Sequence, residues 1–413
     1  MRALCRVAAA LLLLGLAGPA PAERVVGVYY AASGKAEAAA SLPAEQLTHL
    51  VYAFATMCGR HAGIPAEAAA ERARHCRGRR PFEITLPGDA GTRAELAALA
   101  ALKARNPDLK LILSVGGWGM PLYPDMIRNA TTRATFVRSV ASFLRAHPPF
   151  DGVDVDWEYP GGGDNVRPLL AEAERQAEAE AFRALARELR ATLDDLGRRH
   201  RRPYQLTAAV AGYKRSVRGV DWPGTQGWFN YLFVMTYDFT PEKAFAVRGD
   251  FSGGGGPPGH HTNLHASPAT EGYGADAMVR TLAEAGVPRA KMVIGAALYA
   301  RAWKDVDWSA GTFPAATPKG SFVGTIPYRQ LGARAGRGYD AAAEAAYVAD
   351  GAAFLSFDDP RSICAKGRWA IRHGLAGIFA WEASQDDSTL IPAMRASVEG
   401  RCPDAPAGPG ERR

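Results

Sequence analysis

The sequence predicts an α/β protein built as one closed (β/α)₈ barrel, in which eight parallel strands alternate with helices. Two observations predict it: eight short runs rich in β-branched and aromatic residues, and amphipathic helical patterns between several of them. The runs are nearly continuously apolar, which is typical of parallel strands covered on both faces. Strands that alternate with helices form right-handed β-α-β units, and eight such units favour a closed barrel over an open sheet. The runs are Arg24–Tyr30, Leu47–Ala55, Lys110–Trp118, Gly152–Tyr159, Gln205–Val210, Tyr231–Phe239, Lys291–Ala300 and Gly377–Glu382.

Three stretches between these runs have the periodicity of helices. In the first, leucines recur at helical spacing after Thr92, which we expect to cap the helix. The second has an apolar face at i, i+4, i+7 and i+8, and the third extends a similar face over a longer stretch. One apolar face on each helix predicts that all three cover the strands. The apolar positions are Leu96, Leu99, Leu102, then Phe136, Val140, Phe143, Leu144, then Phe182, Leu185, Leu189, Leu193 and Leu196.

The chain of 413 residues is 47% hydrophobic and 22% charged, which excludes intrinsic disorder and collagen-like repeats. We assign residues 23–400 to the barrel. Within them, residues 304–354 contain glycines, aromatic residues and turn residues and do not fit a simple loop. We therefore expect a small α+β subdomain there, inserted between strand seven and the following helix. Residues 401–413 are rich in proline and glycine and are expected to form a disordered tail.

Residues 1–22 have the pattern of a secretory signal peptide. Met1–Arg6 carries two positive charges, Val7–Ala17 is apolar, and Ala20–Ala22 offers an A-x-A cleavage site. The apolar stretch is shorter than the ~20 residues that a membrane span needs, and no other segment is long and apolar enough. We expect a secreted protein, extracellular or periplasmic, with no membrane attachment after cleavage. An uncleaved anchor is the alternative.

The formal net charge is +7, and the basic residues are scattered along the chain. The densest cluster, Arg198–Arg202, is typical of a solvated helix end, so we expect no nucleic-acid partner. The sequence contains no G-x-S-x-G, Walker or dinucleotide-binding motif, which removes support for a triad hydrolase or a nucleotide enzyme. A monomer is the expected oligomeric state.

Four cysteines remain once Cys5 is removed with the signal peptide. An even number suits an oxidising compartment, and four cysteines allow three disulfide pairings. We favour the two local bridges because each closes a modest loop, and keep a zinc site as the alternative, although no C-x-x-C spacing occurs. The favoured pairs are Cys58 with Cys76 and Cys364 with Cys402.

The stretch Phe150–Pro160 carries the most chemical information. Successive side chains on a strand alternate between faces, so Asp154, Asp156 and Glu158 share one face, with neighbours ~7 Å apart. That face points into the barrel and ends at its C-terminal mouth. Buried like charges repel, and burial disfavours each anion, so at least one proton should stay on this row near neutral pH. A carboxylic acid held protonated there can act as a general acid. A metal cage and a polar core network are the alternatives, although calcium sites prefer loop spacing.

With this row the sequence resembles the glycoside hydrolase family 18 chitinases, because Asp151, Asp154, Asp156 and Glu158 match their D-x-x-D-x-D-x-E signature. The likeness runs from about residue 25 to residue 398, in order and with family-like spacing. Four further motifs carry it: Ser114–Trp118 resembles S-x-G-G on strand three, Met235–Asp238 resembles M-x-Y-D on strand six, Tyr299–Trp303 resembles Y-G-R-G-W on strand seven with alanine at both glycines, and Ala380–Glu382 resembles the strand-eight tryptophan motif.

The resemblance implies a retaining, substrate-assisted mechanism that needs no cofactor and no metal. Glu158 would protonate the glycosidic oxygen and later activate water, while the carbonyl oxygen of the substrate's own N-acetyl group attacks and forms an oxazolinium intermediate. Asp156 would hydrogen-bond the acetamido N–H and stabilise developing charge. Asp154 would share a proton with Asp156, and Tyr237 would donate to the acetamido oxygen.

The resemblance also implies residues that bind sugar or support the site. Trp381 would form the floor of a sugar site, since aromatic faces stack on the apolar face of a pyranose. Asp151 would brace its strand, and either Tyr29 or Tyr30 would steady Asp154. Trp118 and Trp303 fit subsite contact and packing equally well. The substrate-binding candidates are Trp381, Asp238, Arg301, Trp118, Tyr299 and Ser114, of which Asp238, Arg301 and Ser114 would contact either the sugar or the residues behind it.

The activity implied is that of a secreted chitinase acting on chitin or N-acetylglucosamine oligosaccharides. One alternative is a lectin-like relative without turnover, although such relatives usually lack the acid that Glu158 supplies here. The other is the same mechanism on a different glycan, as in an endo-β-N-acetylglucosaminidase or a peptidoglycan hydrolase. The inserted subdomain would deepen the cleft, which favours a polymeric substrate.

Three histidines in a Gly-rich loop, His260, His261 and His265, raise the possibility of a zinc site. Only His261 and His265 have i, i+4 spacing, and the surrounding glycines and prolines argue against a helix that would hold them. We therefore expect no metal.

Overall fold

The computed structural model describes residues 24–60, 64–162, 167–239, 257–266, 270, 272–334 and 336–402. The predicted signal peptide at 1–22 and residues 403–413 of the predicted tail lie outside these ranges. Within the described ranges, no helix combines the length and the apolar character needed to cross a membrane.

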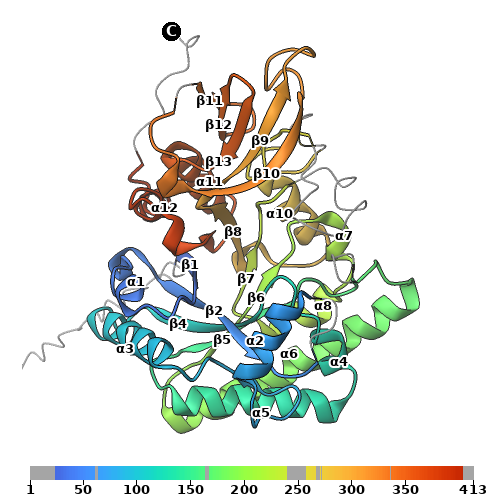
Figure 1. Ribbon diagram of the computed structural model, residues 1–413. Coiled ribbons are helices and arrows are strands. Elements are labelled where there is room, and N and C mark those ends of the chain that lie inside the picture. The colour runs from blue at the N-terminus through green and yellow to red at the C-terminus, as the bar shows by residue number, and fades with distance from the viewer. Residues whose placement is uncertain are drawn as a thin grey trace, which may run out of the picture.

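Eight parallel strands close into a barrel, which confirms the predicted fold class (Figure 1). The first strand pairs with the last on one side, Val25 facing Gly377, and with the second strand on its other side, so the circle is complete. A short strand, β3 (Ile84–Thr85), adds an antiparallel edge to the second barrel strand. The barrel strands are β1 (Val25–Ala31), β2 (His49–Met57), β4 (Lys110–Gly116), β5 (Gly152–Asp156), β6 (Gln205–Val210), β7 (Tyr231–Val234), β8 (Met292–Ala297) and β14 (Gly377–Trp381).

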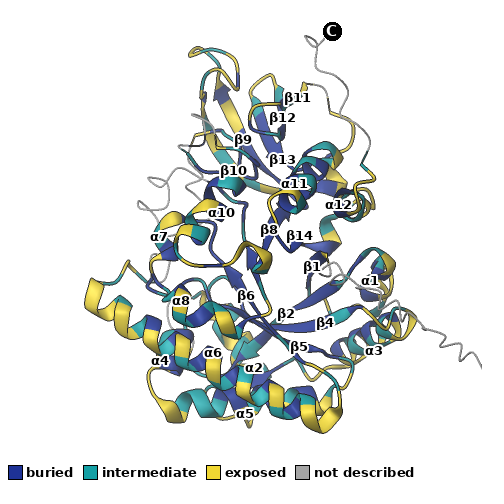
Figure 2. Cartoon of the chain, turned by 180° about the vertical axis from the view of Figure 1, so that it is seen from behind, coloured by how far each residue is buried: buried dark blue, intermediate teal, exposed yellow. Residues whose placement is uncertain are grey.

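Helices surround the barrel, and most have a buried inner face and an exposed outer face, whereas the helix Ala66–His75 has no buried residue (Figure 2). The three predicted helices form, and the leucine face predicted for the longest one is buried. The cap of the first was predicted wrongly: Asp89 is the N-cap, and its Oδ1 accepts from the backbone N–H of Thr92 at 2.7 Å. The helices are α1 (Ala36–Ala40), α2 (Ala66–His75), α3 (Ala90–Arg105), α4 (Tyr123–Ile127), α5 (Ala130–Ala146), α6 (Glu172–His200), α7 (Lys214–Val217), α8 (Trp222–Thr225), α10 (Ala275–Glu284), α11 (Pro360–Arg372) and α12 (Leu390–Glu399).

The strand β5 has two very different faces. Val153 and Val155 point outward and are buried in the layer between strands and helices. Trp157, just beyond the strand, continues this face, and its ring packs edge-on against Phe182 of α6 at 5.7 Å. The hydrocarbon face anchors the strand, which leaves the opposite face free to carry carboxylates into the barrel.

The inserted subdomain is larger and more β-rich than predicted. It starts at Tyr299 directly after β8 and ends at Phe357 before α11, whereas residues 304–354 were predicted, because the apolar run through Ala300 breaks into two strands at Leu298. In its described part it contains no α-helix, so the α+β description was wrong. Trp303 packs inside it against Phe354 at 5.7 Å. Its antiparallel sheet consists, in the order β10-β9-β13-β12-β11, of β9 (Tyr299–Asp307), β10 (Lys319–Pro327), β11 (Arg337–Asp340), β12 (Ala345–Asp350) and β13 (Ala353–Phe357).

Two disulfides tie elements that are close in sequence. Cys58 at the end of β2 is bonded to Cys76 after α2, and Cys364 of α11 is bonded to Cys402 beyond α12. This is the pairing favoured from loop length. The second bridge holds Cys402, which had been assigned to the disordered tail, so the ordered chain extends at least that far.

Candidate active site

A cleft of about 390 Å³ opens where the barrel strands end. The carboxyl ends of the barrel strands, and the residues just beyond them, supply most of its walls, and two residues, Tyr299 and Thr325, come from the inserted sheet. The lining residues are Tyr29, Phe54, Trp118, Asp156, Glu158, Tyr159, Gly212, Tyr213, Met235, Tyr237, Asp238, Tyr299, Thr325, Trp381 and Gln385.

Asp154 lies deepest in the row and is completely buried. Its Oδ2 accepts from the hydroxyls of Tyr29 at 2.9 Å and Ser114 at 2.7 Å, and its Oδ1 accepts from Thr207 at 2.7 Å. Burial raises the pKa of Asp154, while these three donors oppose the rise. The choice between two tyrosines left open by the sequence is settled in favour of Tyr29, because Tyr30 donates to Glu95 instead.

Asp156 is the opposite case. It is buried, and its Oδ1 has no hydrogen-bond partner among the described residues. Burial raises the pKa of Asp156 well above its usual value, and the nearby charges of Glu158 and Asp154 raise it further. Of the two buried aspartates, Asp156 therefore has the more strongly raised pKa, and burial and the neighbouring charges favour its protonated form. Glu158, two residues beyond it, is partly exposed in the cleft.

Two consecutive glycines allow this row to sit against the neighbouring strand. Gly116 pairs with Asp156, has a φ of 123°, and a Cβ there would lie 1.9 Å from the carbonyl oxygen of Asp156. A Cβ on Gly117 would lie 2.6 Å from the ring of Phe54. The S-x-G-G pattern is thus explained by close approach of backbone and ring, which only glycine permits.

Tyr237 stands beside the carboxylate row with its ring against Gly295, where a Cβ would lie 2.7 Å from the tyrosine Cε1. Burial raises the pKa of Tyr237 well above its usual value, and the charges of Asp156 and Glu158 add to the rise. The phenol therefore stays protonated and is available as a hydrogen-bond donor to a ligand in the cleft.

Aromatic rings form one side of the cleft. The ring of Trp381 stacks on Phe54, with centroids 5.7 Å apart and planes 20° apart, and Tyr29 lies 5.9 Å from the same indole. Trp118 lines the cleft too and packs edge-on against Tyr159 at 6.4 Å. Such a surface suits the apolar face of a sugar ring.

Asp238 also lines the cleft, in a left-handed conformation with φ of 57°. The hydroxyl of Tyr213 donates to its backbone carbonyl at 2.7 Å. Although burial opposes ionisation, a contact from His261 and the charge of Arg301 lower the pKa of Asp238 overall. Asp238 therefore presents an anion to the cleft.

Two predicted substrate-binding residues do not line the cleft. Ser114 is fully buried and donates to Asp154. Arg301 is 2% exposed, lies 3.5 Å from Asp238 through Nη1, and has its guanidinium 4.5 Å from the ring of Phe322. Ser114 contacts Asp154 and Arg301 contacts Asp238, so each supports a carboxylate of the site and does not itself reach the cleft.

Asp151 lies at the start of β5, away from the cleft lining. Its Oδ2 accepts from Lys103 and from the backbone N–H of Leu111, both at 2.8 Å, and its Oδ1 from Arg202 at 3.2 Å. This placement agrees with the bracing role proposed for it.

Several lining residues were not predicted. Phe54 lies near the carboxyl end of the predicted run Leu47–Ala55, and Gln385 lies shortly after the run Gly377–Glu382, so their position near strand ends could have identified them. Thr325 could not have been found this way, because it reaches the cleft from the inserted β10.

The three loop histidines contact three different aspartates. His260 lies 3.2 Å from Asp340, and His265 lies 3.1 Å from Asp276. His261 faces Asp238. Over the part of the chain that the structure describes, no group of three or more His, Cys, Asp or Glu side chains is arranged to hold a metal.

Comparison with known proteins adds independent evidence. The family model described as Glycosyl hydrolases family 18 matches residues 25–386. The probable endochitinase of Orgyia pseudotsugata multicapsid polyhedrosis virus is 35% identical over 321 residues, which cover 74% of this chain and 56% of that protein. Chitinase A of Pseudoalteromonas piscicida is 34% identical over 349 residues, which cover 73% of this chain and 41% of that protein. The chain thus spans about half the length of the curated relatives it matches.

Among solved structures, a glycoside hydrolase family 18 N-acetylglucosaminidase from Paenibacillus barengoltzii is 29% identical. It aligns with a TM-score of 0.71 and covers 91% of this chain and 100% of its own.

Proposed function

Because the chain belongs to glycosyl hydrolases family 18, we propose that it is a chitinase that hydrolyses β-1,4 linkages between N-acetylglucosamine units. The observation that carries the proposal is the row of Asp154, Asp156 and Glu158, in which the last member alone is partly exposed in an aromatic cleft. The chitinases among its relatives support the same substrate.

In the first step, Glu158 gives its proton to the glycosidic oxygen. The bond from this oxygen to C1 breaks, and the carbonyl oxygen of the acetamido group on the same sugar bonds to C1. The product is an oxazolinium cation, so the substrate provides the nucleophile that most glycosidases take from a second carboxylate.

Asp156 and Tyr237 act on the acetamido group in this proposal. Asp156 accepts from its N–H, while the proton that Asp156 holds is shared with Asp154 or Glu158, the two carboxylates that raise its pKa. Tyr237 donates to the acetamido oxygen and fixes its direction of attack. Both contacts strengthen as charge develops, which is where binding energy accelerates a reaction.

In the second step, a water molecule attacks C1 and passes its proton to the carboxylate of Glu158. The bond from C1 to the acetamido oxygen breaks, the amide is restored, and the product leaves with retained configuration. Glu158 thereby regains its proton for the next cycle.

The test is product release from chitotetraose and chitohexaose by the purified protein. We expect wild type to release chitobiose, with the β-anomer formed first in NMR spectra, and Glu158→Gln to release at least 10²-fold less, on the order of the loss expected when a general acid is removed. Glu284→Gln on the exposed surface of α10 is the matched control and should retain wild-type rates.

Other outcomes would redirect the proposal. Oligosaccharide binding without cleavage by wild type would indicate a lectin. Cleavage of an N-glycan core or of peptidoglycan, but not of chitin oligosaccharides, would indicate an endo-β-N-acetylglucosaminidase or a peptidoglycan hydrolase. Equal activity of Glu158→Gln and wild type would remove Glu158 as the acid.

We also propose export and a monomeric state, on the basis of the signal pattern at 1–22 and the two disulfides. Protein recovered outside a secreting host should begin at Glu23 and have the mass of one chain by light scattering. Intracellular protein that retains Met1 would contradict export.

A further inference from the structure

His261 lies behind the wall of the cleft, at a buried position where an apolar side chain would pack equally well. It is completely buried, and neither ring nitrogen makes an ordinary hydrogen bond with a described residue. Its Nδ1 lies 3.5 Å from Oδ1 of Asp238, and its ring centroid lies 5.2 Å from that of Tyr299. Two buried polar atoms without close partners are costly, so their presence needs an explanation.

The backbone of His261 is held from both sides. Its N–H donates to Ser356 Oγ at 3.0 Å, and its carbonyl accepts from Phe239 N–H at 3.0 Å. The segment around it is therefore hydrogen-bonded both to β13 of the inserted sheet and to the chain that follows Asp238.

The next residue is anchored still more firmly. Thr262 Oγ1 donates to Asp358 at 2.7 Å and accepts from Lys366 at 2.7 Å, while Lys366 and Asp358 form an ion pair at 2.6 Å with both side chains fully buried. Asp358 also accepts from the backbone N–H of Ala297 at the end of β8 and from Ser362 of α11. We call these residues, Thr262, Ala297, Asp358, Ser362 and Lys366, the Asp358–Lys366 cluster.

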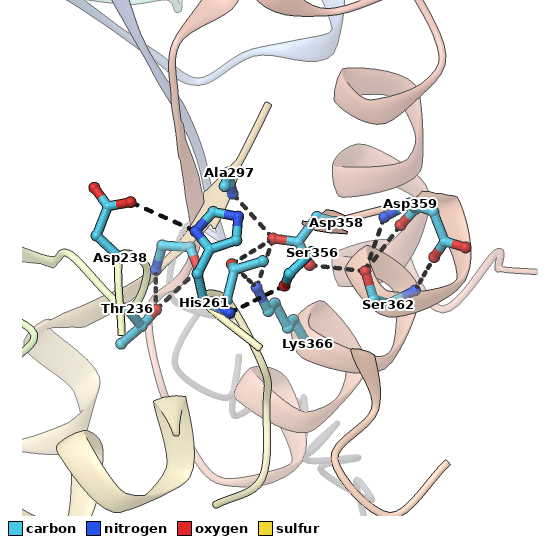
Figure 3. Close-up of polar contacts among 11 residues, drawn as sticks. Thr236, Asp238, His261, Ala297, Ser356, Asp358, Asp359, Ser362 and Lys366 are labelled. Atoms are coloured by element: carbon cyan, nitrogen blue, oxygen red, sulfur yellow. Dashed lines mark hydrogen bonds and ion pairs between the residues drawn. The ribbon is translucent and has the colours of Figure 1, made fainter. Parts of the chain in front are cut away.

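Figure 3 shows the result: the imidazole of His261 points toward Asp238, on the side away from Lys366. Because the cluster holds Thr262, the backbone next to His261 is fixed, and this fixed backbone keeps the imidazole close to Asp238. Arg301 faces the same carboxylate at 3.5 Å, so Asp238 lies between a permanent cation and a neutral ring.

We propose that His261 is a positioning residue for Asp238: its Nδ1–H donates to the carboxylate and holds it in the orientation that contacts the sugar. At 3.5 Å the contact is slightly longer than an ordinary hydrogen bond, and catalytic contacts commonly tighten when substrate binds. His261 itself touches no reacting atom. This role rests on the proposed function, because it concerns the same cleft.

The test compares two replacements that differ in one property. His261→Gln keeps an N–H donor, and His261→Leu keeps bulk but has no donor. His265→Leu is the control, because His265 is in the same loop and also contacts an aspartate, but this aspartate, Asp276, does not line the cleft.

We expect His261→Leu to lower kcat/KM for chitotetraose by about 10- to 100-fold, the scale on which small misplacements act. His261→Gln should stay within about threefold of wild type, and His265→Leu should match wild type. A purely structural role would affect His261→Gln and His261→Leu alike. Equal losses in both, or no loss in His261→Leu, would overturn the proposal.

A second measurement needs no substrate. Because the contact with His261 lowers the pKa of Asp238, His261→Leu should raise that pKa in ¹³C NMR titrations, with the Asp238 signal assigned by its absence in Asp238→Asn. An unchanged pKa would overturn the proposal. If wild type cleaves no N-acetylglucosamine oligosaccharide, the proposed function fails, and this titration still decides the role of His261.

The reciprocal variant covers the case in which His261→Leu does not fold. The charge of Asp238 raises the pKa of His261 against burial, so Asp238→Asn should lower it. An unchanged His261 titration in Asp238→Asn would contradict the contact.

Discussion

Asp154 and Asp156 in the barrel interior and Asp358 in the Asp358–Lys366 cluster are all buried, but of these three only Asp358 has a cation as a partner among the described residues. In the barrel, Asp154 and Asp156 lie two residues apart on one strand face, and hydroxyls donate to the first, whereas no described residue donates to the Oδ1 of the second. In the cluster, Asp358 has Lys366 at 2.6 Å together with hydroxyl and backbone donors.

The difference teaches what each arrangement can do. Buried like charges without a cation retain a proton, and a retained proton can be delivered to a substrate. A buried ion pair with satisfied hydrogen bonds retains no mobile proton, but it fixes the position of every group that it contacts. The carboxylate row of the barrel is therefore suited to proton transfer, and the Asp358–Lys366 cluster is suited to holding neighbouring residues in place.

Lys366→Met should produce the largest effect, because it leaves Asp358 buried without its cation. We expect a loss of about 3–5 kcal/mol in the free energy of unfolding, measured by chemical denaturation. Lys304→Met, at an exposed position, should change it by less than about 0.5 kcal/mol.

A double variant sharpens this result. Adding Asp358→Asn to Lys366→Met removes the unpaired charge, so the double variant should be more stable than the sum of the two single losses predicts. Strict additivity would mean that the ion pair is not the source of the effect.

Asp156→Asn removes the carboxyl group whose protonated form is favoured by burial, and it should leave the shape of the cleft nearly unchanged. We expect kcat to fall by about 10²–10³-fold, the loss seen when one group that stabilises developing charge is removed. Binding of chitotetraose, followed by calorimetry, should remain within about threefold of wild type. Asp108→Asn, at an exposed position, is the control, and an unchanged rate in Asp156→Asn would exclude Asp156 from the mechanism.

The same variant should show a small gain in stability that depends on pH. The folded-state pKa of Asp156 is raised, so the folded protein loses stability as pH rises from the unfolded value of 3.8 through the raised pKa. Asparagine has no such loss. The midpoint of thermal unfolding should therefore be a few degrees higher in Asp156→Asn at pH 7, and the two proteins should converge below pH 4. A constant difference across this range would contradict the raised pKa.

The parts of the molecule that follow from alternation along one strand could be predicted from sequence. The eight runs gave the barrel, and the period of two along Gly152–Glu158 placed Asp154, Asp156 and Glu158 on one face. In both cases the relevant neighbours are set by the geometry of a strand, which a local pattern reports directly.

Features that depend on contacts between distant segments could not be predicted from the sequence. Tyr29 and Tyr30 are adjacent, and only the register of β1 decides which one meets Asp154. The partner of His261 is another such case, because it depends on where the loop is anchored by Asp358 and Lys366. Thr325 enters the cleft from an inserted sheet whose fold the barrel pattern does not describe.

The pairing of β1 with β14 has a consequence for how the protein is made. Val25 and Gly377 are neighbours in the sheet although nearly the whole chain separates them. During synthesis the first strand therefore cannot complete its pairing until the last one, Gly377–Trp381, has been made, and the barrel cannot close before that point. Such long-range pairing slows folding, and the barrel stays open until its last strand has been added.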